Sequence, residues 1–196
     1  MSVRDRIFEA TAKVAAEEGP AHLTLDRVAE VAGVSKGGLL YHFPTKNSLL
    51  QGVIAFESDK FEAAVQRLVD EGVPFLEAYV DVTCETHRNL AQVAPALIAA
   101  AAVDKNLLVP FKARCDAWNL RLLDYGVHPA SAQAAMLLGD GLLVGTALAV
   151  VSVTDEDLIH LKKRMLWLLR PVYEEELAET ARYALEHVHD PAPAPA

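Results

Sequence analysis

The strongest constraint on the fold is the spacing of apolar side chains, which recur every three or four residues along nearly the whole chain. That period is typical of amphipathic helices, and the few clusters of β-branched residues fall within it instead of forming an alternating strand pattern. Over residues 4–18 the apolar stripe ends at Gly19-Pro20, the usual order of a C-cap glycine followed by proline. We therefore predict an all-α protein.

Capping residues divide the chain into short helices first and longer ones later. Thr24, Ser35 and Thr45 are good N-caps, Gly33 ends the second helix after about two turns, and Pro44 ends the third. The fourth helix runs from the last of these caps to about residue 69. Further helices are expected over about residues 74–89, 95–103, 108–125, 130–153, 155–170 and 171–187.

This succession predicts a small helical head (residues 1–50), a larger helical body (51–188) and a Pro-Ala tail (189–196). With 52% apolar and 23% charged residues, the composition is that of a folded globular protein. The longest aliphatic run, 96–103, falls short of the roughly 20 residues that cross a membrane, and residues 1–6 hold no export signal. We expect a cytoplasmic protein without a cofactor, in which Cys84 and Cys115 are free thiols.

The segment from Thr24 to Phe43 has the spacing of a helix-turn-helix. Ala29 is small enough for two short helices to cross closely, and Gly33 permits the left-handed residue that so tight a turn requires. The second helix of such a unit presents its N-terminal residues to the DNA major groove. There the side chain of Lys36 can reach a base edge or a phosphate, and backbone N–H groups at residues 35–37 can meet phosphate oxygens.

The charge distribution permits DNA binding by the head, although the whole chain has a formal net charge of −9. Residues 1–50 carry six basic and six acidic side chains, so all of the excess acidity lies in the remainder. A neutral module can gather its bases on one face. The motif alone is equally compatible with an ordinary helical hairpin.

The run Ala-Gly-Val-Ser-Lys-Gly-Gly-Leu-Leu-Tyr-His-Phe-Pro-Thr-Lys at residues 32–46, followed by Leu49 and Leu50, resembles the DNA-binding head of the TetR family of transcriptional regulators. The resemblance covers roughly residues 5–52 and is more specific than a generic helix-turn-helix. It implies an all-helical homodimer whose C-terminal body binds a small molecule and alters the spacing of two DNA-reading heads. The loop at residues 126–129 and the Asp-Gly-Leu at 140–142 resemble the family's dimerisation region more loosely.

Carried over residue by residue, the resemblance implies a set of DNA contacts in the head. Many members carry another side chain at the position of Gly38 and tyrosine at the position of Leu40, so two contacts of the usual readout are missing here. Close backbone approach to the duplex at the paired glycines is a compensating hypothesis. The predicted DNA-binding residues are Thr24, Arg27, Ser35, Lys36, Gly37, Gly38, Tyr41, His42 and Lys46.

The resemblance also implies two sites in the body. Small residues on the helix at 130–153 let two helices approach closely, and with the apolar face of 155–170 they predict a four-helix interface across a two-fold axis; packing within one subunit is the alternative. The predicted interface comprises Gly139, Gly141, Leu142, Gly145, Leu158, Leu161, Met165, Trp167 and Leu168. The predicted ligand cavity comprises Phe75, Tyr79, Cys84, His87, Phe111, Cys115, Trp118, Asn119 and Leu122, any of which is otherwise plain core.

We expect a ligand-responsive repressor that binds a palindromic DNA operator as a homodimer and is released by a small, largely apolar effector. A corepressor-dependent or activating regulator of the same fold, or a helical adaptor without DNA binding, are the alternatives. We expect no enzymatic activity, because Cys84 and His87 share a helix face without an oriented base or oxyanion site. No metal site is expected either, because His187 and His189 lack a closed ligand set.

Overall fold

The computed structural model describes residues 2–19, 21–90 and 93–170, and the side chains of residues 87–90 are not among the described parts. Every regular element in these ranges is a helix, which confirms the predicted all-α class. The elements are α1 (Val3–Glu17), α2 (Leu25–Ala32), α3 (Lys36–His42), α4 (Lys46–Asp70), α5 (Phe75–Leu90), α6 (Ala94–Val103), the 3-10 helix η1 (Lys105–Leu108), α7 (Val109–Asp124), α8 (Pro129–Ala147) and α9 (Asp155–Leu169).

Side-chain caps fix where the helices of the head begin. Ser2, Thr24, Ser35 and Thr45 each accept a hydrogen bond from the backbone N–H three residues on, which satisfies a donor that the first turn leaves free. At Thr45 the bond is reciprocal, because Ser48 Oγ accepts from the backbone N–H of Thr45 at 3.0 Å. These short helices are therefore specified largely by local sequence.

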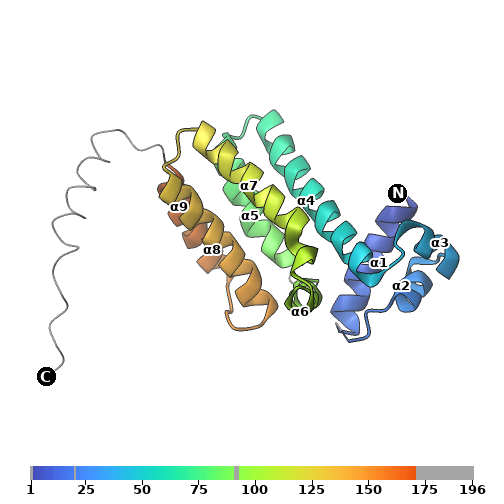
Figure 1. Cartoon of the computed structure of the whole chain (residues 1–196). Coiled ribbons are helices and arrows are strands. Elements are labelled where there is room, and N and C mark those ends of the chain that lie inside the picture. Colours follow the sequence, from blue (N-terminus) through green and yellow to red (C-terminus); the bar gives the residue numbers. More distant parts are fainter. Residues whose placement is uncertain (1, 20, 91–92, 171–196) are drawn as a thin grey trace, which may run out of the picture.

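Helix α4 connects the head to the body. It runs without interruption from the head, where α1, α2 and α3 lie, into the group formed by α5, α7, α8 and α9 (Figure 1). The predicted boundary at residue 50 therefore falls inside a continuous helix. Helix α6 lies between the head and the lower ends of the body helices in this view.

Two hydrophobic cores hold the chain together, and the first extends beyond the head. It is built on α1 to α4 around residues such as Ile7, Phe8, Leu39 and Leu50, but it also includes Val93, Ala96, Ala101 and Leu107 from the α6–η1 region. The second core lies within the body, between α4, α5, α7, α8 and α9. The α6–η1 region is thus packed against the DNA-reading module.

Helix α8 ends six residues earlier than predicted. The N–H of Val150 donates to the carbonyl of Gly145 and that of Ala149 to Thr146, with Ala149 at φ 54°. These are the bonds of a left-handed helix stop that glycine usually makes, so the alanine concealed it from sequence analysis. The predicted helix at 171–187 and the tail lie outside the described residues. None of the described helices is sufficiently long and apolar to span a membrane.

Candidate DNA-binding head and effector cavity

The geometry of α2 and α3 is that of a helix-turn-helix. Gly33 adopts φ 64°, the predicted left-handed conformation, and the N–H of Val34 donates to the carbonyl of Ala29 at 3.0 Å. Ala29 and Val28 are buried where the helices cross, and Leu39 anchors α3 in the core of the head. The opposite side of α3 therefore faces outward.

Most of the predicted DNA-binding residues lie on this outer surface. Tyr41 is 85% exposed, and its ring meets that of His42 edge-on at 5.2 Å between centroids. The backbone N–H of Gly38 is occupied by the Ser35 hydroxyl at 3.1 Å, so this amide is engaged in the helix cap. Thr24, Ser35, Lys36, Gly37, Tyr41, His42 and Lys46 are exposed, whereas Gly38 is half-buried.

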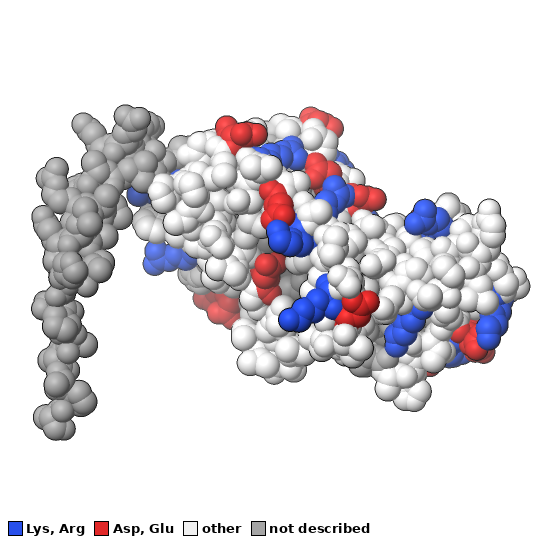
Figure 2. Space-filling model, viewed as in Figure 1, with Lys and Arg blue, Asp and Glu red and all other residues white. Residues whose placement is uncertain are grey.

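Lys36 is held by an acidic neighbour from the other helix of the motif. Its Nζ lies 2.8 Å and 3.0 Å from the two carboxylate oxygens of Asp26 on α2, and both side chains are mostly exposed. An exposed pair of this kind contributes little to stability and exchanges readily for another anion. On the face in Figure 2, basic side chains are spread over the head with acidic ones beside them at its outer end, and acidic and basic side chains also lie close together over the body.

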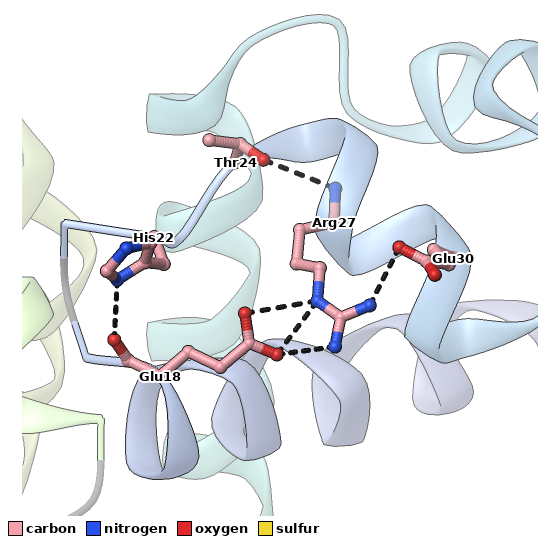
Figure 3. A network of polar contacts seen from close by, with 5 residues as sticks. All are labelled: Glu18, His22, Thr24, Arg27 and Glu30. Atoms are coloured by element: carbon pink, nitrogen blue, oxygen red, sulfur yellow. Dashed lines mark hydrogen bonds and ion pairs between the residues drawn. The ribbon is translucent and has the colours of Figure 1, made fainter.

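Arg27 is placed differently from the other predicted contacts. Its Nε donates to both carboxylate oxygens of Glu18, at 2.8 and 3.1 Å, and another guanidinium nitrogen lies 2.7 Å from Glu30 (Figure 3). The Glu18 carboxylate also lies 2.6 Å from a third nitrogen of the same group. These two carboxylates raise the pKa of Arg27. The geometry makes Arg27 a positioning residue that fastens α2 to the end of α1.

The Glu18–Arg27 pair predicts a specific pH dependence of stability. Hydrogen bonding to Arg27 lowers the pKa of Glu18 from its ordinary 4.5, so this carboxylate stabilises the fold above that pH and loses its effect as pH falls through the lower folded value. We expect Glu18→Gln to lower the melting temperature at neutral pH, with the difference from wild type disappearing in acid. Thermal unfolding of both proteins over a pH series measures this. A constant difference down to acid would contradict the prediction.

A cavity of about 370 Å³ lies in the body, within the size range of small-molecule sites. Its lining residues come from α4, α5, α6, η1, α7 and α8. Most of the lining is apolar, with aromatic rings from Phe61, Tyr79, Phe111 and Trp118. The remaining lining residues are Ile54, Glu57, Ser58, Thr83, Thr86, Ala94, Leu97, Ile98, Ala101, Leu108, Arg114, Cys115, Met136, Gly139, Asp140, Leu143 and Val144.

The structure brings four of the nine predicted ligand residues to the cavity: Tyr79, Phe111, Cys115 and Trp118. Phe75, Cys84 and Leu122 are buried in the body core instead, where Phe75 stacks on the rings of Trp118 and Tyr125. Asn119 is half-buried outside the lining. The side chain of His87 lies outside the described residues.

Asp140 is a cavity residue that the sequence analysis assigned no role at the ligand site. It is the one charged residue of α8, and that isolation in an apolar helix was a signal available in the sequence. Burial raises the pKa of its carboxyl. Burial also raises the pKa of Tyr79 to about 12 and that of Cys115 to about 11, so both remain protonated and uncharged at neutral pH.

The predicted interface residues divide among three environments. Leu142, Leu158 and Met165 are buried inside the protomer's own core, and Leu161 packs against it. Gly139 lines the cavity, where an added Cβ would come within 2.7 Å of Thr83 Cγ2, so this glycine serves the contact between α8 and α5. Trp167 is 55% exposed and Gly141 has open space beside it, whereas Gly145 faces Val151 and Leu168 is half-buried.

Fold and site together define a helix-turn-helix DNA-binding protein with an internal body cavity. Residues 7–53 match the family model for bacterial regulatory proteins of the tetR family, and residues 73–170 match the tetracyclin repressor-like C-terminal domain. The second match alone covers half of the chain. The chain therefore belongs to the TetR family of transcriptional regulators, which are DNA-binding proteins and not enzymes.

The curated relatives match only part of the chain. The nucleoid occlusion factor SlmA of Aliivibrio fischeri is 33% identical over 69 residues, 35% of each chain. The HTH-type transcriptional regulator SrpR of Pseudomonas putida is 37% identical over 59 residues, 30% of this chain and 28% of that protein. The chain thus spans about a third of the length of the curated relatives it matches.

Solved structures share the fold over most of the chain. A transcriptional regulator from Rhodococcus sp. Rha1 superposes with a TM-score of 0.72 and 23% identity, covering 86% of this chain and 96% of that one. The multidrug binding protein EbrR, solved in complex with ethidium, gives a TM-score of 0.57 and 25% identity, covering 87% and 100%. These solved structures therefore share the fold of the body as well as that of the head.

Proposed function

We propose that this regulator is a homodimeric repressor that leaves a palindromic operator when a small molecule fills the body cavity. The observation that carries the proposal is that one helix contributes both to the wall of the cavity and to the core of the head. Ala101 of α6 lines the cavity and also belongs to the hydrophobic core of the head. A ligand that displaces α6 therefore acts directly on the packing of the DNA-reading module.

Polar contacts reinforce this mechanical link. Asn47 at the start of α4 donates to the carboxylate of Asp104, just after α6, at 3.0 Å, and Gln51 donates to the carbonyl of Asn106 in η1 at 3.4 Å. Helix α4 enters both the head and the cavity lining, where it contributes Ile54. The ligand then releases DNA if it binds more tightly to the conformation in which the two heads are wrongly spaced for the operator.

The proposed dimer forms through α8 and α9. Exposed apolar residues form a single stripe at helical spacing, at Leu137 and Val144 of α8 and at its C-cap residue Leu148, with Gly141 between the first two. Ile159 and Trp167 are exposed on α9. An apolar face of this kind on two adjacent helices is typical of a two-fold interface. Heads in successive major grooves then lie about 34–36 Å apart.

Leu137→Glu tests this interface, because it places a charge on the most exposed leucine of the stripe. We expect it to weaken dimerisation by at least about tenfold, since buried unpaired charge is strongly unfavourable at an apolar interface. Analytical ultracentrifugation measures the shift toward monomer. Leu120→Glu is the matched control, since Leu120 is a similarly exposed leucine on α7 (62% against 63%). Equal dimer affinity in both variants would refute the proposed interface.

The function itself is tested by fluorescence anisotropy of the protein on DNA fragments tiled from the flanks of its own gene, over a series of salt concentrations. We expect tight binding to one fragment at two protomers per site, with a steep fall in affinity as salt rises. Titrating ligands against the preformed complex then gives the sign of regulation. Weak and equal binding to every fragment would favour an operator elsewhere or the adaptor alternative.

A further inference from the structure

The charged side chains that line the cavity differ in whether they have an ion-pair partner. The lining includes two carboxylates, Glu57 and Asp140, and one guanidinium, Arg114. Glu57 is neutralised by Lys60, whose Nζ lies 3.1 Å away, and Arg114 is paired with Asp59. Within the described ranges, no side chain or backbone group forms an ion pair or hydrogen bond with the Asp140 carboxylate. Its charge is therefore open to the cavity.

The position of Asp140 makes that charge effective inside the cavity. Asp140 on α8 lines the same cavity as Tyr79 on α5 and Cys115 on α7, so its carboxylate and these two walls face one ligand volume. The surroundings are apolar, so water screens the charge less than at the surface. A carboxylate removed from water without a partner is costly, and at a cavity wall a ligand can relieve that cost.

The rest of the lining suits the apolar part of a cation. Four aromatic rings, Phe61, Tyr79, Phe111 and Trp118, come from α4, α5 and α7. The rings of Phe61 and Tyr79 each lie within 5.3 Å of the Trp118 ring, centroid to centroid, so three of the four form one cluster. Aromatic faces attract a positive charge as well as apolar surface.

We propose that the effector is a small lipophilic cation whose positive charge lies against Asp140 and whose apolar part packs on the aromatic cluster. The inference rests on the proposed function in that it concerns the same cavity. An anionic effector would be repelled by the unpaired carboxylate of Asp140. A neutral apolar effector would leave this half-buried carboxylate without a partner, whereas a cation would pair with it.

The test uses two probes of nearly identical shape that differ in charge: phenyltrimethylammonium and its neutral carbon analogue tert-butylbenzene. Calorimetric titration of each into the wild-type dimer, Asp140→Asn and Asp116→Asn separates ligand charge from ligand shape. Asp116 is the matched control, because it is an exposed carboxylate on α7 that lies outside the cavity and pairs with Lys112. Operator affinity without probe, expected to be equal in all three proteins, confirms that the variants are folded.

We expect Asp140→Asn to weaken binding of the cation by about 10- to 100-fold, less than the loss of one partner of a fully buried charge pair because Asp140 is half-buried, and to leave the neutral probe unchanged or bound more tightly. Asp116→Asn should alter cation affinity less than twofold, because an exposed charge contributes little interaction energy. An equal loss of affinity for both probes in Asp140→Asn would overturn the inference. The substitution would then have changed the shape of the cavity, and the charge of Asp140 would make no difference to binding.

Two other outcomes separate this inference from the proposed function. Binding of the neutral probe alone to wild type overturns the cationic effector and leaves a ligand-responsive repressor intact. Failure of both probes to bind a protein that still binds its operator overturns both the cationic effector and the cavity as effector site, while DNA recognition by the head stands.

Discussion

We expect reversal of both charges in Lys36→Glu/Lys46→Glu to weaken operator binding strongly while leaving the fold intact. Both lysines are exposed on the outer surface of the head, one at the first residue of α3 and the other at the first residue of α4. Each reversal removes a phosphate partner and adds repulsion, so we expect at least about a 100-fold loss of affinity and a shallower salt dependence. Anisotropy on the operator fragment measures both quantities.

The matched control is Lys112→Glu, which reverses a charge of similar exposure on α7 of the body. It should change operator affinity little, since Lys112 lies on α7 and is not one of the predicted DNA-binding residues. Thermal unfolding checks that the double variant is folded, because the Lys36–Asp26 pair is exposed and contributes little to stability. A folded double variant that binds the operator as tightly as wild type would contradict the assigned DNA-binding surface.

The head was predictable because its structure is encoded locally. Each of its helices starts at a Ser or Thr cap whose hydroxyl accepts from an N–H three residues on, and Gly33 makes the left-handed turn that the motif requires. These signals lie within a few residues of what they determine. Arg27 is the instructive exception in the head. Its partner Glu18 comes from another helix, so the sequence could not show that its guanidinium is already occupied.

The body was less predictable, because the same spacing of apolar residues is found in the protein core, in the cavity lining and on the exposed surface. Phe75 and Trp118 were both assigned to the cavity, yet Phe75 is core and Trp118 is lining. Leu158 and Trp167 were both assigned to the interface, yet the first is buried within the protomer and the second exposed. Which side of a helix meets core, cavity or outside depends on how neighbouring helices are rotated, which periodicity does not determine.

Gly52 of α4 was not singled out in the sequence, although it fixes how closely α4 approaches the rest of the head. A Cβ at this position would lie 2.7 Å from Cε1 of Phe43 and 2.9 Å from Cε1 of Phe8. Both rings are buried, and the Phe8 ring is itself packed against those of Phe43 and Phe56. Neither ring can withdraw without displacing its neighbours, so the site has no room for one more methyl group.

We therefore expect Gly52→Ala to destabilise the protein by about 1–3 kcal/mol, the usual cost of overpacking a core. For a chain of this size that lowers the melting temperature by about 2–4 °C per kcal/mol, measured at equal protomer concentration. The gain in helix propensity, about 1 kcal/mol, opposes the clash. Phe43 caps the C-terminus of α3, so operator affinity should fall as well.

Gly37→Ala is the control for the thermal measurement, because nothing lies within 4 Å of a Cβ at that exposed position of α3. It gains helix propensity without a clash and should be at least as stable as wild type. The two variants make the same chemical change in helices of the same module, and the expected effects have opposite sign. If Gly52→Ala proved as stable as Gly37→Ala, the rings of Phe8 and Phe43 would not be fixed, and α4 could shift against the head at little cost. Under the proposed mechanism, a ligand that moves α4 would then no longer shift α3 through these two rings.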